Sequence, residues 1–411
     1  MLFFRIFFTN FSRSYNYAFF TLSALKISEY FFPGANNEEK FLNFFILYPI
    51  IFLGKPLGSI IFGIIADKFG NIYMIRFTSI LSVFSIFLLI FIPSYSDIGY
   101  IASICAFLSR VIFISTTSVE TDALRLLLVK NFQDKILANG VSSFFSQFAV
   151  LVASIIYKYG IFSSWKIGFV IGALLSLISI IIQMKDIKNS KDIKTAKKID
   201  IRFSYFKKIF LQNYKMIFIF AIIHGIIGGL YHFAIIFFSN FLVLRDILDK
   251  ASASNVSIYM VFCYMFFCLL SGVFSFKNKE KSRKQILFCI SFAIILLIVQ
   301  SVIWNHLDKF SYLFAIILQM AFISVIPFFS LPILYFLQNL LSTNMLPLPL
   351  TLYSISHSLG SLFISSNTIW VIFYIWKKTN SYINITLFII ILLILMILAF
   401  NILSKLIVKK G

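Results

Sequence analysis

Acidic residues, histidine and cysteine are scarce in this chain. Among 411 residues there are 15 aspartates and glutamates, four histidines and four cysteines, against 36 lysines and arginines. No paired catalytic carboxylates, Ser-His-Asp order or Walker-type phosphate loop can be recognised, and no cysteines have the spacing of a zinc site or a disulfide framework. The sequence therefore indicates no enzyme, no metal site and no cofactor, and the cysteines are expected to be packing residues of apolar segments.

Long apolar runs dominate what is present. The chain is 60% hydrophobic and 12% charged, and a helix needs about 20 apolar residues to cross a bilayer. Hydropathy predicts twelve spans, and hence an all-α, multi-pass membrane protein. The first apolar stretch, flanked by Arg5 and Arg13, is interpreted as a retained helix rather than a cleaved signal. The predicted spans are 8–31, 41–65, 74–93, 99–128, 137–158, 162–184, 214–241, 253–276, 285–304, 310–338, 347–375 and 381–405.

The net charge of +21 could suggest nucleic acid, but the pattern favours topology as its cause. Basic residues gather in alternate segments between the apolar runs, whereas the other segments are nearly balanced in charge. Cationic loops belong on the cytoplasmic side. Both termini are therefore expected in the cytoplasm, and the basic segments include Lys68 and Arg76, Lys130 and Lys135, 185–215, 277–284 and 405–410.

A long polar stretch divides six spans from six. It predicts an N-terminal bundle at 1–184, a basic linker at 185–213 and a C-terminal bundle at 214–411. The linker is interpreted as a solvated segment that touches anionic lipid, with a membrane-surface or regulatory role as the alternative. A weak repeat, 209 residues apart, relates the segment at Gly63 to that at Gly272. Two related halves are typical of transporters with a site near the middle of the membrane.

One loop resembles a known family. The segment GIIADKFGN, 63–71, is similar to the motif that follows span two in the major facilitator superfamily. Just before it, KPLG at 55–58 stands where the metabolite:proton symporters, the group of proline/betaine and 2-oxoglutarate permeases, carry Arg-Pro-Ile/Leu-Gly. Arg110 and Glu120 also keep that group's spacing of ten residues in span four. Shorter matches occur at 31–33, 134–135 and 164–167, so the resemblance covers most of the N-terminal half.

The resemblance implies a major facilitator fold of two pseudo-symmetric six-helix bundles. It also implies a gating motif at Gly63, Asp67, Lys68 and Gly70, in which the aspartate helps to hold the two halves closed on the cytoplasmic side. The chain departs from the group in span one. Where the group has Glu-Trp-Tyr-Asp-Phe, this sequence has RSYNY at 13–17, so both carboxylates are missing and proton coupling loses two of its usual carriers.

Span four holds the deepest charges. Helical spacing places Arg110, Thr117 and Thr121 on one stripe, with Glu120 beside it. A charge kept inside a span needs a partner or a cavity. Arg110 is interpreted as the group that meets an anionic part of the substrate, and Glu120 as a proton carrier or as a partner of Arg110. The alternative is a structural charge network between helices.

Other candidates come from spans one, four, seven and eleven. Tyr15 and Asn16 occupy the departed segment of span one, and Asp122 and Arg125 are spaced to form an ion pair near the cytoplasmic end of span four. His224 and Tyr231 share a face of span seven, and His357 lies in the polar span eleven. These histidines could bind substrate or carry a proton, or they could simply bond a neighbouring helix.

The sequence thus predicts a secondary active transporter for a small anionic or zwitterionic metabolite or osmolyte. It would be a monomer in a bacterial inner membrane, in contact with lipid, and would work by alternating access and proton symport. An uncoupled facilitator and a non-transporting sensor or scaffold with the same fold are the alternatives. A transferase that uses His306 or His357 would need a paired acidic or nucleophilic partner, which the sequence does not supply.

Overall fold

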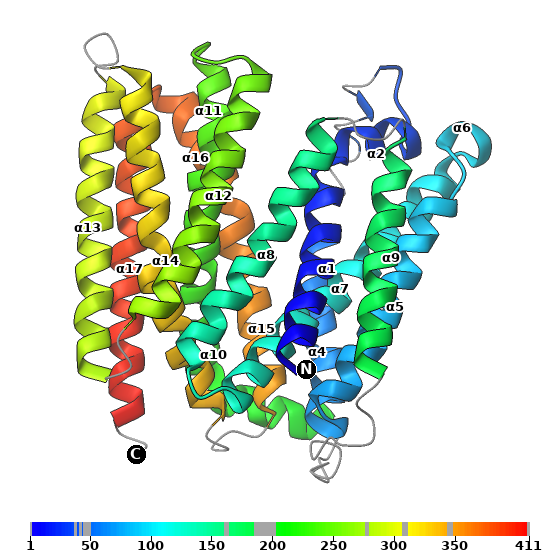
Figure 1. The fold of residues 1–411 in the computed structure, drawn as a ribbon, viewed down its shortest axis with the longest axis horizontal. Helices are drawn as coiled ribbons and strands as arrows, with labels where there is room; N and C mark the ends of the chain where they lie inside the picture. Colours follow the sequence, from blue (N-terminus) through cyan, green and yellow to red (C-terminus); the bar gives the residue numbers. More distant parts are fainter. Residues whose placement is uncertain are drawn as a thin grey trace. The chain divides into compact units, whose positions relative to one another are not determined.

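The computed structural model describes residues 2–36, 39–40, 43, 51–159, 164–184, 203–275, 279–305, 311–342 and 348–408. Within these ranges all the regular elements are helices (Figure 1). They are α1 (Leu2–Leu22), α2 (Ala24–Phe31), α4 (Gly54–Phe69), α5 (Asn71–Phe91), α6 (Tyr95–Ile98), α7 (Tyr100–Asn131), α8 (Lys135–Lys158), α9 (Trp165–Met184), α10 (Phe203–His232), α11 (Phe238–Leu244), α12 (Lys250–Phe274), α13 (Lys279–Asn305), α14 (Tyr312–Ser342), α15 (Pro349–Gly360), α16 (Ser366–Thr379) and α17 (Tyr382–Val408). Two π-helical turns, η2 (Phe233–Phe237) and η3 (Ser361–Ser365), join α10 to α11 and α15 to α16.

Ten helical segments of the described chain are long and apolar enough to cross a membrane. They correspond to the third to twelfth predicted spans, which confirms a multi-pass, all-α architecture. The first predicted span is two helices, α1 and α2, which meet at Ser23, and α1 begins at Leu2 rather than at residue 8. Part of the second span lies outside the described residues. Of the rest, residues 43 and 51–52 are helical, Leu53 is a turn, and α4 follows.

The chain forms two compact units. One comprises Met1–Leu128, Phe145–Lys208 and Leu346–Ile355, and the other Val129–Phe144, Ile209–Met345 and Ser356–Gly411. The boundary runs through α7, α8, α10 and α15, because each of these helices has residues in both units. Most of the predicted linker lies outside the described residues, and its last part, 203–213, is the beginning of α10.

In the first unit, small and polar residues hold α1 against α9. The hydroxyls of Thr9 and Ser179 are 2.8 Å apart, and those of Ser12 and Ser176 are 2.9 Å apart. The side chain of Asn16 donates to the carbonyl of Gly172 at 3.0 Å. Hydrogen bonds between hydroxyls and amides satisfy polar groups that lipid cannot, so this face of α1 is turned inward.

In the second unit, each π-helical turn has a carbonyl that a side chain from another helix reaches. Gln319 of α14 donates its amide to the carbonyl of Ala234 in η2 at 3.0 Å. The Nδ1 atom of His232, at the end of α10, lies 3.0 Å from the carbonyl of Ser365 in η3. A π-turn interrupts the regular helical hydrogen bonds, and π-turns occur often at functional sites. Each π-turn of the second unit is therefore in contact with a side chain from another helix.

Candidate functional site

Arg110 of α7 is the centre of the first unit's deepest cation site. Its side chain is 4% exposed. The guanidinium carbon lies 3.6 Å from the centre of the Phe20 ring, 4.8 Å from that of Phe113 and 5.4 Å from that of Tyr17. Aromatic faces stabilise a desolvated cation through their quadrupoles. The rings therefore keep a positive charge inside the unit.

A small pocket adjoins Arg110. Polar side chains from α1, α5 and α7 line it, namely Asn16, Ser85 and Ser109, together with apolar ones such as Phe20 and Phe169. Its free space suits roughly one water molecule. The serine at 109 donates to the carbonyl of Ser85 at 2.6 Å, which ties α7 to α5 beside the arginine.

Glu120, one of the predicted candidates, lies in a second pocket. It is 2% exposed, and Ser79 of α5 donates a hydrogen bond of 2.7 Å to its carboxylate. Arg13 of α1 lines the same pocket and attracts it electrostatically. The sequence suggested Arg110, on the same helix, as the partner of Glu120. In the structure, the cation beside Glu120 is Arg13 of α1.

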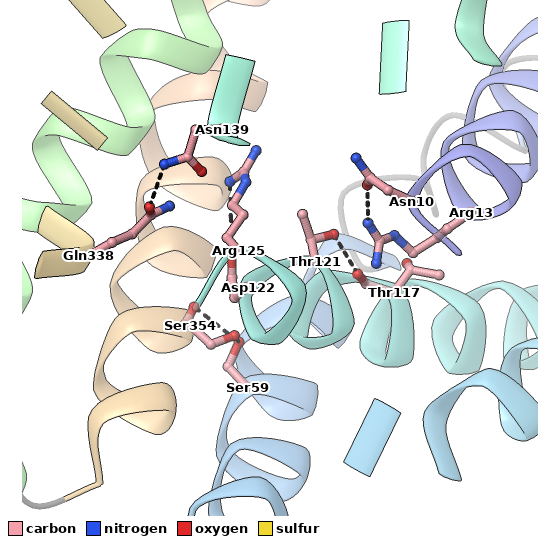
Figure 2. Close-up of polar contacts among 10 residues, drawn as sticks. All are labelled: Asn10, Arg13, Ser59, Thr117, Thr121, Asp122, Arg125, Asn139, Gln338 and Ser354. Carbon is pink, nitrogen blue, oxygen red and sulfur yellow. Dashed lines mark hydrogen bonds and ion pairs between the residues drawn. The ribbon is translucent and has the colours of Figure 1, made fainter. Parts of the chain in front are cut away.

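Arg13 is held in place from its own helix. One guanidinium nitrogen donates to Asn10, one turn earlier, at 2.6 Å (Figure 2). Hydroxyl groups of α1, α5 and α9 complete the pocket, which like the first has room for roughly one water molecule. The remaining polar lining is Thr9, Ser12, Ser79, Ser82, Ser176 and Ser179.

The rest of the predicted polar stripe of α7 is engaged locally. Thr117 donates to the carbonyl of Phe113 at 2.8 Å, and Thr121 donates to that of Thr117 at 2.8 Å (Figure 2). The predicted pair is present, with Arg125 Nη1 3.9 Å from Asp122 Oδ1. Asp122 is fully buried and Arg125 is partly exposed, so the carboxylate has a cation at the edge of the unit.

The span-one candidates Tyr15 and Asn16 point toward α9. The hydroxyl of Tyr15 donates to the carbonyl of Gly168 at 3.2 Å, and its ring stacks on Phe19. Asn16 bonds Gly172, as described above, and its Oδ1 atom is buried beside the Arg110 pocket. Tyr15 thus packs between helices, whereas Asn16 does this and also lines a pocket.

The second unit brings two predicted histidines together. The rings of His224 on α10 and His357 on α15 have centres 4.7 Å apart. Close backbone contact between these helices makes this possible, because a Cβ atom at Gly360 would lie 2.2 Å from the carbonyl oxygen of Ala221. Tyr231, the third candidate in this unit, meets Tyr264 of α12 edge to face at 5.2 Å.

Asp67, the predicted gating aspartate, lies at the start of α15. Asp67 accepts hydrogen bonds from the backbone N–H groups of Leu350 at 3.0 Å and Thr351 at 2.9 Å. These amides belong to the first turn of α15, where N–H groups lack helical partners and the helix dipole attracts an anion. Within the first unit Asp67 therefore caps α15 from another helix.

The other residues of the motif shape this contact. Gly63 lets α4 approach α15, since a Cβ atom there would be 2.8 Å from the Cα of Thr351. Gly70 ends α4 with a φ of 98°, a value that favours glycine. Lys68 lies over the ring of Phe69 at 5.0 Å.

Three residues near the candidate sites were not among the predicted candidates, namely Arg13, Lys55 and Ser79. Arg13 stands in the segment where the resembling group has carboxylates, so the departure itself was the available signal. Ser79 has no distinguishing pattern around it. Lys55 served only to support the resemblance, yet its amine lies over Phe52 at 4.9 Å and over Tyr17 at 6.0 Å.

Solved structures of transporters share this architecture over nearly the whole chain. The human organic anion transporter MFSD10 matches with a TM-score of 0.71 and 9% identity, over 98% of both chains. The proton:xylose symporter XylE, from E. coli, matches with a TM-score of 0.71 and 12% identity, over 98% of this chain and 94% of that one. The chain has the major facilitator fold. A bacterial homologue of the iron transporter ferroportin agrees, with a TM-score of 0.70 and 14% identity over 98% of this chain and 99% of that one.

Sequence relatives of the chain agree with the resemblance found in its motifs. A predicted proline/betaine transporter of Staphylococcus aureus is 27% identical over 173 residues, which is 38% of this chain and 36% of that protein. The proline/betaine transporter of Salmonella typhimurium is 29% identical over 97 residues, 24% of this chain and 19% of that protein. These matches thus span between about a fifth and little more than a third of the length of the sequence relatives. No protein-family model matches it.

Proposed function

We propose that this protein is a secondary transporter for a small anionic or zwitterionic metabolite. The observation that carries the proposal is Arg110, a buried cation beside a polar pocket in a chain with the major facilitator fold. Keeping a charge inside a membrane span costs about 2.5 to 3.5 kcal/mol on insertion scales. Binding an anion would offset part of that cost.

Alternating access fits the contact between Asp67 and α15. The carboxylate holds the start of a helix whose later residues belong to the other compact unit. We assign Asp67, with Gly63, Lys68 and Gly70, to gating on the cytoplasmic side. The basic loops support a cytoplasmic location of both termini in an inner membrane. The transporter would act as a monomer surrounded by lipid.

Proton symport is the coupling that we propose, with Glu120 as the carrier. Its carboxylate is buried, lies next to a hydroxyl and faces Arg13 rather than bulk water. When protonated, Glu120 would release its hold on Arg13, so proton binding and the charge state of the pocket are linked. His224 and His357 are a second place for a proton. Because their imidazole rings are adjacent, the pair would hold one proton more readily than two.

Uptake of labelled metabolites into vesicles or cells tests the proposal. The panel should include carboxylates, amino acids and betaines, and Arg110→Ala and Arg110→Glu should both lose uptake of the substrate that is found. Arg245→Ala is a matched control, since Arg245 also lies over an aromatic ring, that of Trp376 at 5.6 Å, but is exposed. Normal uptake by folded Arg110 variants would show that the substrate role is wrong.

Two further measurements separate the rival functions. A symporter should make the medium more alkaline when substrate is added to energised cells, and an uncoupled facilitator should not. A sensor or scaffold should retain no more label than control vesicles across the whole panel.

A further inference from the structure

Arg13 and Glu120 line the same pocket without a direct bond between them. Glu120 accepts a hydrogen bond from Ser79, and one guanidinium nitrogen of Arg13 donates to Asn10. The other terminal nitrogen of Arg13, Nη1, is buried and has no hydrogen-bond partner in the described part of the chain. The two charges therefore attract each other across the pocket, and N–H donors of a lining residue are left unused.

One hydroxyl hydrogen at this pocket is also unused. The hydroxyls of Thr9 and Ser179 lie 2.8 Å apart, and the side-chain amide of Gln183 donates to both, at 2.9 and 3.2 Å. Only one of the two hydroxyls can donate in the bond that they share. The hydrogen of the other has no acceptor among the described residues, so the pocket offers unused donors from a hydroxyl as well as from Arg13.

An anion is the ligand that suits such a lining. A guanidinium group donates hydrogen bonds and accepts none, and a hydroxyl with an unused hydrogen donates as well. Glu120 already supplies one anion, because its carboxylate accepts from Ser79 and attracts Arg13. The side chain of Glu120 is thus a built-in counter-ion of the pocket, which a free anion can replace once the carboxyl group is neutral.

Protonation of Glu120 changes the charge of the pocket. A neutral carboxyl group no longer balances Arg13, and a buried guanidinium without a counter-charge is costly. The hydroxyl of Ser79 also loses its charged acceptor. An anion that enters at that moment restores the balance, so the proton and the anion together add no net charge.

We propose that the pocket of Arg13 and Glu120 binds a halide ion, chloride under physiological conditions, together with the proton on Glu120. This rests on the proposed role of Glu120 as a proton carrier and adds an inorganic anion to it. The free space is about that of one water molecule, which favours a monatomic anion over a carboxylate, phosphate or sulfate. The solute site proposed at Arg110 lies beside a different pocket.

The charged groups around the pocket single out Glu120 as its titrating group. In the described chain the charges that act on Arg13 are Glu120, Asp122 and Arg125, all from α7. Asp122 and Arg125 form a pair of their own, and the charge that acts on Glu120 is Arg13. The lining residues from α5 and α9 are all serines, namely Ser79, Ser82, Ser176 and Ser179. The titration of Glu120 should therefore set the pH dependence of halide binding.

Thermal unfolding of the purified full-length protein tests the site. Sodium chloride should raise the unfolding temperature when it replaces sodium gluconate at constant ionic strength, because the anion binds the folded state. Since one proton accompanies each halide, the apparent affinity for chloride should fall about tenfold for each pH unit above the range in which Glu120 is protonated. Sodium bromide should act like sodium chloride. Equal unfolding temperatures in chloride and gluconate between about pH 5 and pH 8.5 would overturn the proposal and leave a pocket that holds water only.

Two variants assign the effect to this pair. Glu120→Gln has a neutral side chain at every pH, so chloride should stabilise it at least as well as it stabilises the wild type in acid, and without pH dependence. Arg13→Met should lose the response to chloride. Glu29→Gln and Arg245→Met are matched controls that should keep the wild-type profile, because Glu29 pairs with Lys26 at a partly exposed place and Arg245 is exposed.

The variants can also refute the site. A pH dependence that persists in Glu120→Gln would show that another group carries the proton, and would overturn the proposal. A response of Arg13→Met equal to that of the wild type would do the same. If Arg13→Met does not fold, the profile of Glu120→Gln decides alone.

Uptake separates failure of this inference from failure of the transport function. If cells take up a metabolite and make the medium more alkaline while chloride leaves the unfolding temperature unchanged, proton symport stands and the halide site is wrong. If no metabolite of the panel is taken up while the chloride effect depends on Glu120, the halide site stands and the transport function is wrong.

Discussion

Asp67 holds Thr351 twice: its Oδ2 atom accepts the backbone N–H at 2.9 Å and the side-chain hydroxyl at 2.6 Å. The N–H of Leu350 reaches the other carboxylate oxygen at 3.0 Å. The first turn of α15 thus obtains its acceptors from a residue 284 positions earlier in the chain. A charged acceptor at a helix N-terminus satisfies orphan amides and favours the helix dipole.

Replacing Asp67 should loosen the start of α15. Asp67→Ala should cost about 1 to 2 kcal/mol, the usual scale for a lost N-cap, and Asp67→Asn less, because one acceptor oxygen remains. Hydrogen exchange at Leu350 and Thr351 measures the effect. Lys68→Ala is the control, since that lysine contacts the ring of Phe69. Unchanged exchange at both amides in Asp67→Ala would show that the cap does not protect them.

The pair of Arg13 and Glu120 should behave as one unit in stability measurements. Removing one member of a buried pair leaves an uncompensated charge and costs about 3 to 5 kcal/mol. Glu120→Gln and Arg13→Met should each lower the unfolding temperature, and the double variant should recover a large part of the loss. A double-mutant cycle of thermal midpoints checks this. Strictly additive losses would mean that the two side chains do not interact.

Gly58 should tolerate no side chain. A Cβ atom there would lie 2.1 Å from the carbonyl oxygen of Ser115 in α7, so Gly58→Ala must push two helices apart. The cost should be about 1 to 3 kcal/mol or more, as for overpacking in a core. At Gly272 the nearest atom, the Cα of Leu137, would be 3.1 Å away, so Gly272→Ala should cost less. Equal thermal midpoints of the two variants would contradict the expected order.

The short helix α6 should weaken in acid. Its residue Asp97 accepts hydrogen bonds from the hydroxyl and the backbone N–H of Ser94, at 2.6 and 2.9 Å. These bonds lower the pKa of Asp97 below its ordinary value of 3.8. A lowered carboxyl pKa means that the cap contributes fully above the ordinary pKa and is lost as the pH falls through the lowered one.

Titration of the α6 amides followed by hydrogen exchange or NMR checks this. Amides of α6 should lose protection only below the ordinary carboxyl range, and Asp97→Asn should remove the pH dependence. Loss of protection near neutral pH in the wild type would point to another group.

The spans could be predicted because each is a long apolar run, and such runs fix helices in a membrane almost independently of their neighbours. The finer features could not. The π-turns receive hydrogen bonds from other helices, as from Gln319 to Ala234, and such partners cannot be found from local sequence. The beginning of α10 at Phe203 was also missed, because a polar segment has no hydropathy signal.

Site residues could be predicted where a motif marks them, but their partners could not. The loop motif identified Asp67, whereas no motif near Thr351 indicates that its amide bonds to Asp67. The spacing of Arg110 and Glu120 on one helix identified both as candidates and suggested that they are partners. Only the packing of α1 against α7 shows that Arg13 faces Glu120 and that Tyr17 faces Arg110.

The π-turn η2 changes how span seven can be compared with other sequences. A π-turn contains one residue more than an α-helical turn would need there. Because each residue of an α-helix advances it by about 100°, the segment after η2, including Asn240, is rotated by about that much from where helical counting from His224 would place it. An alignment of this span that introduces no gap within Phe233–Phe237 will therefore place the residues after η2 about a quarter of a turn away from their counterparts on a regular helix.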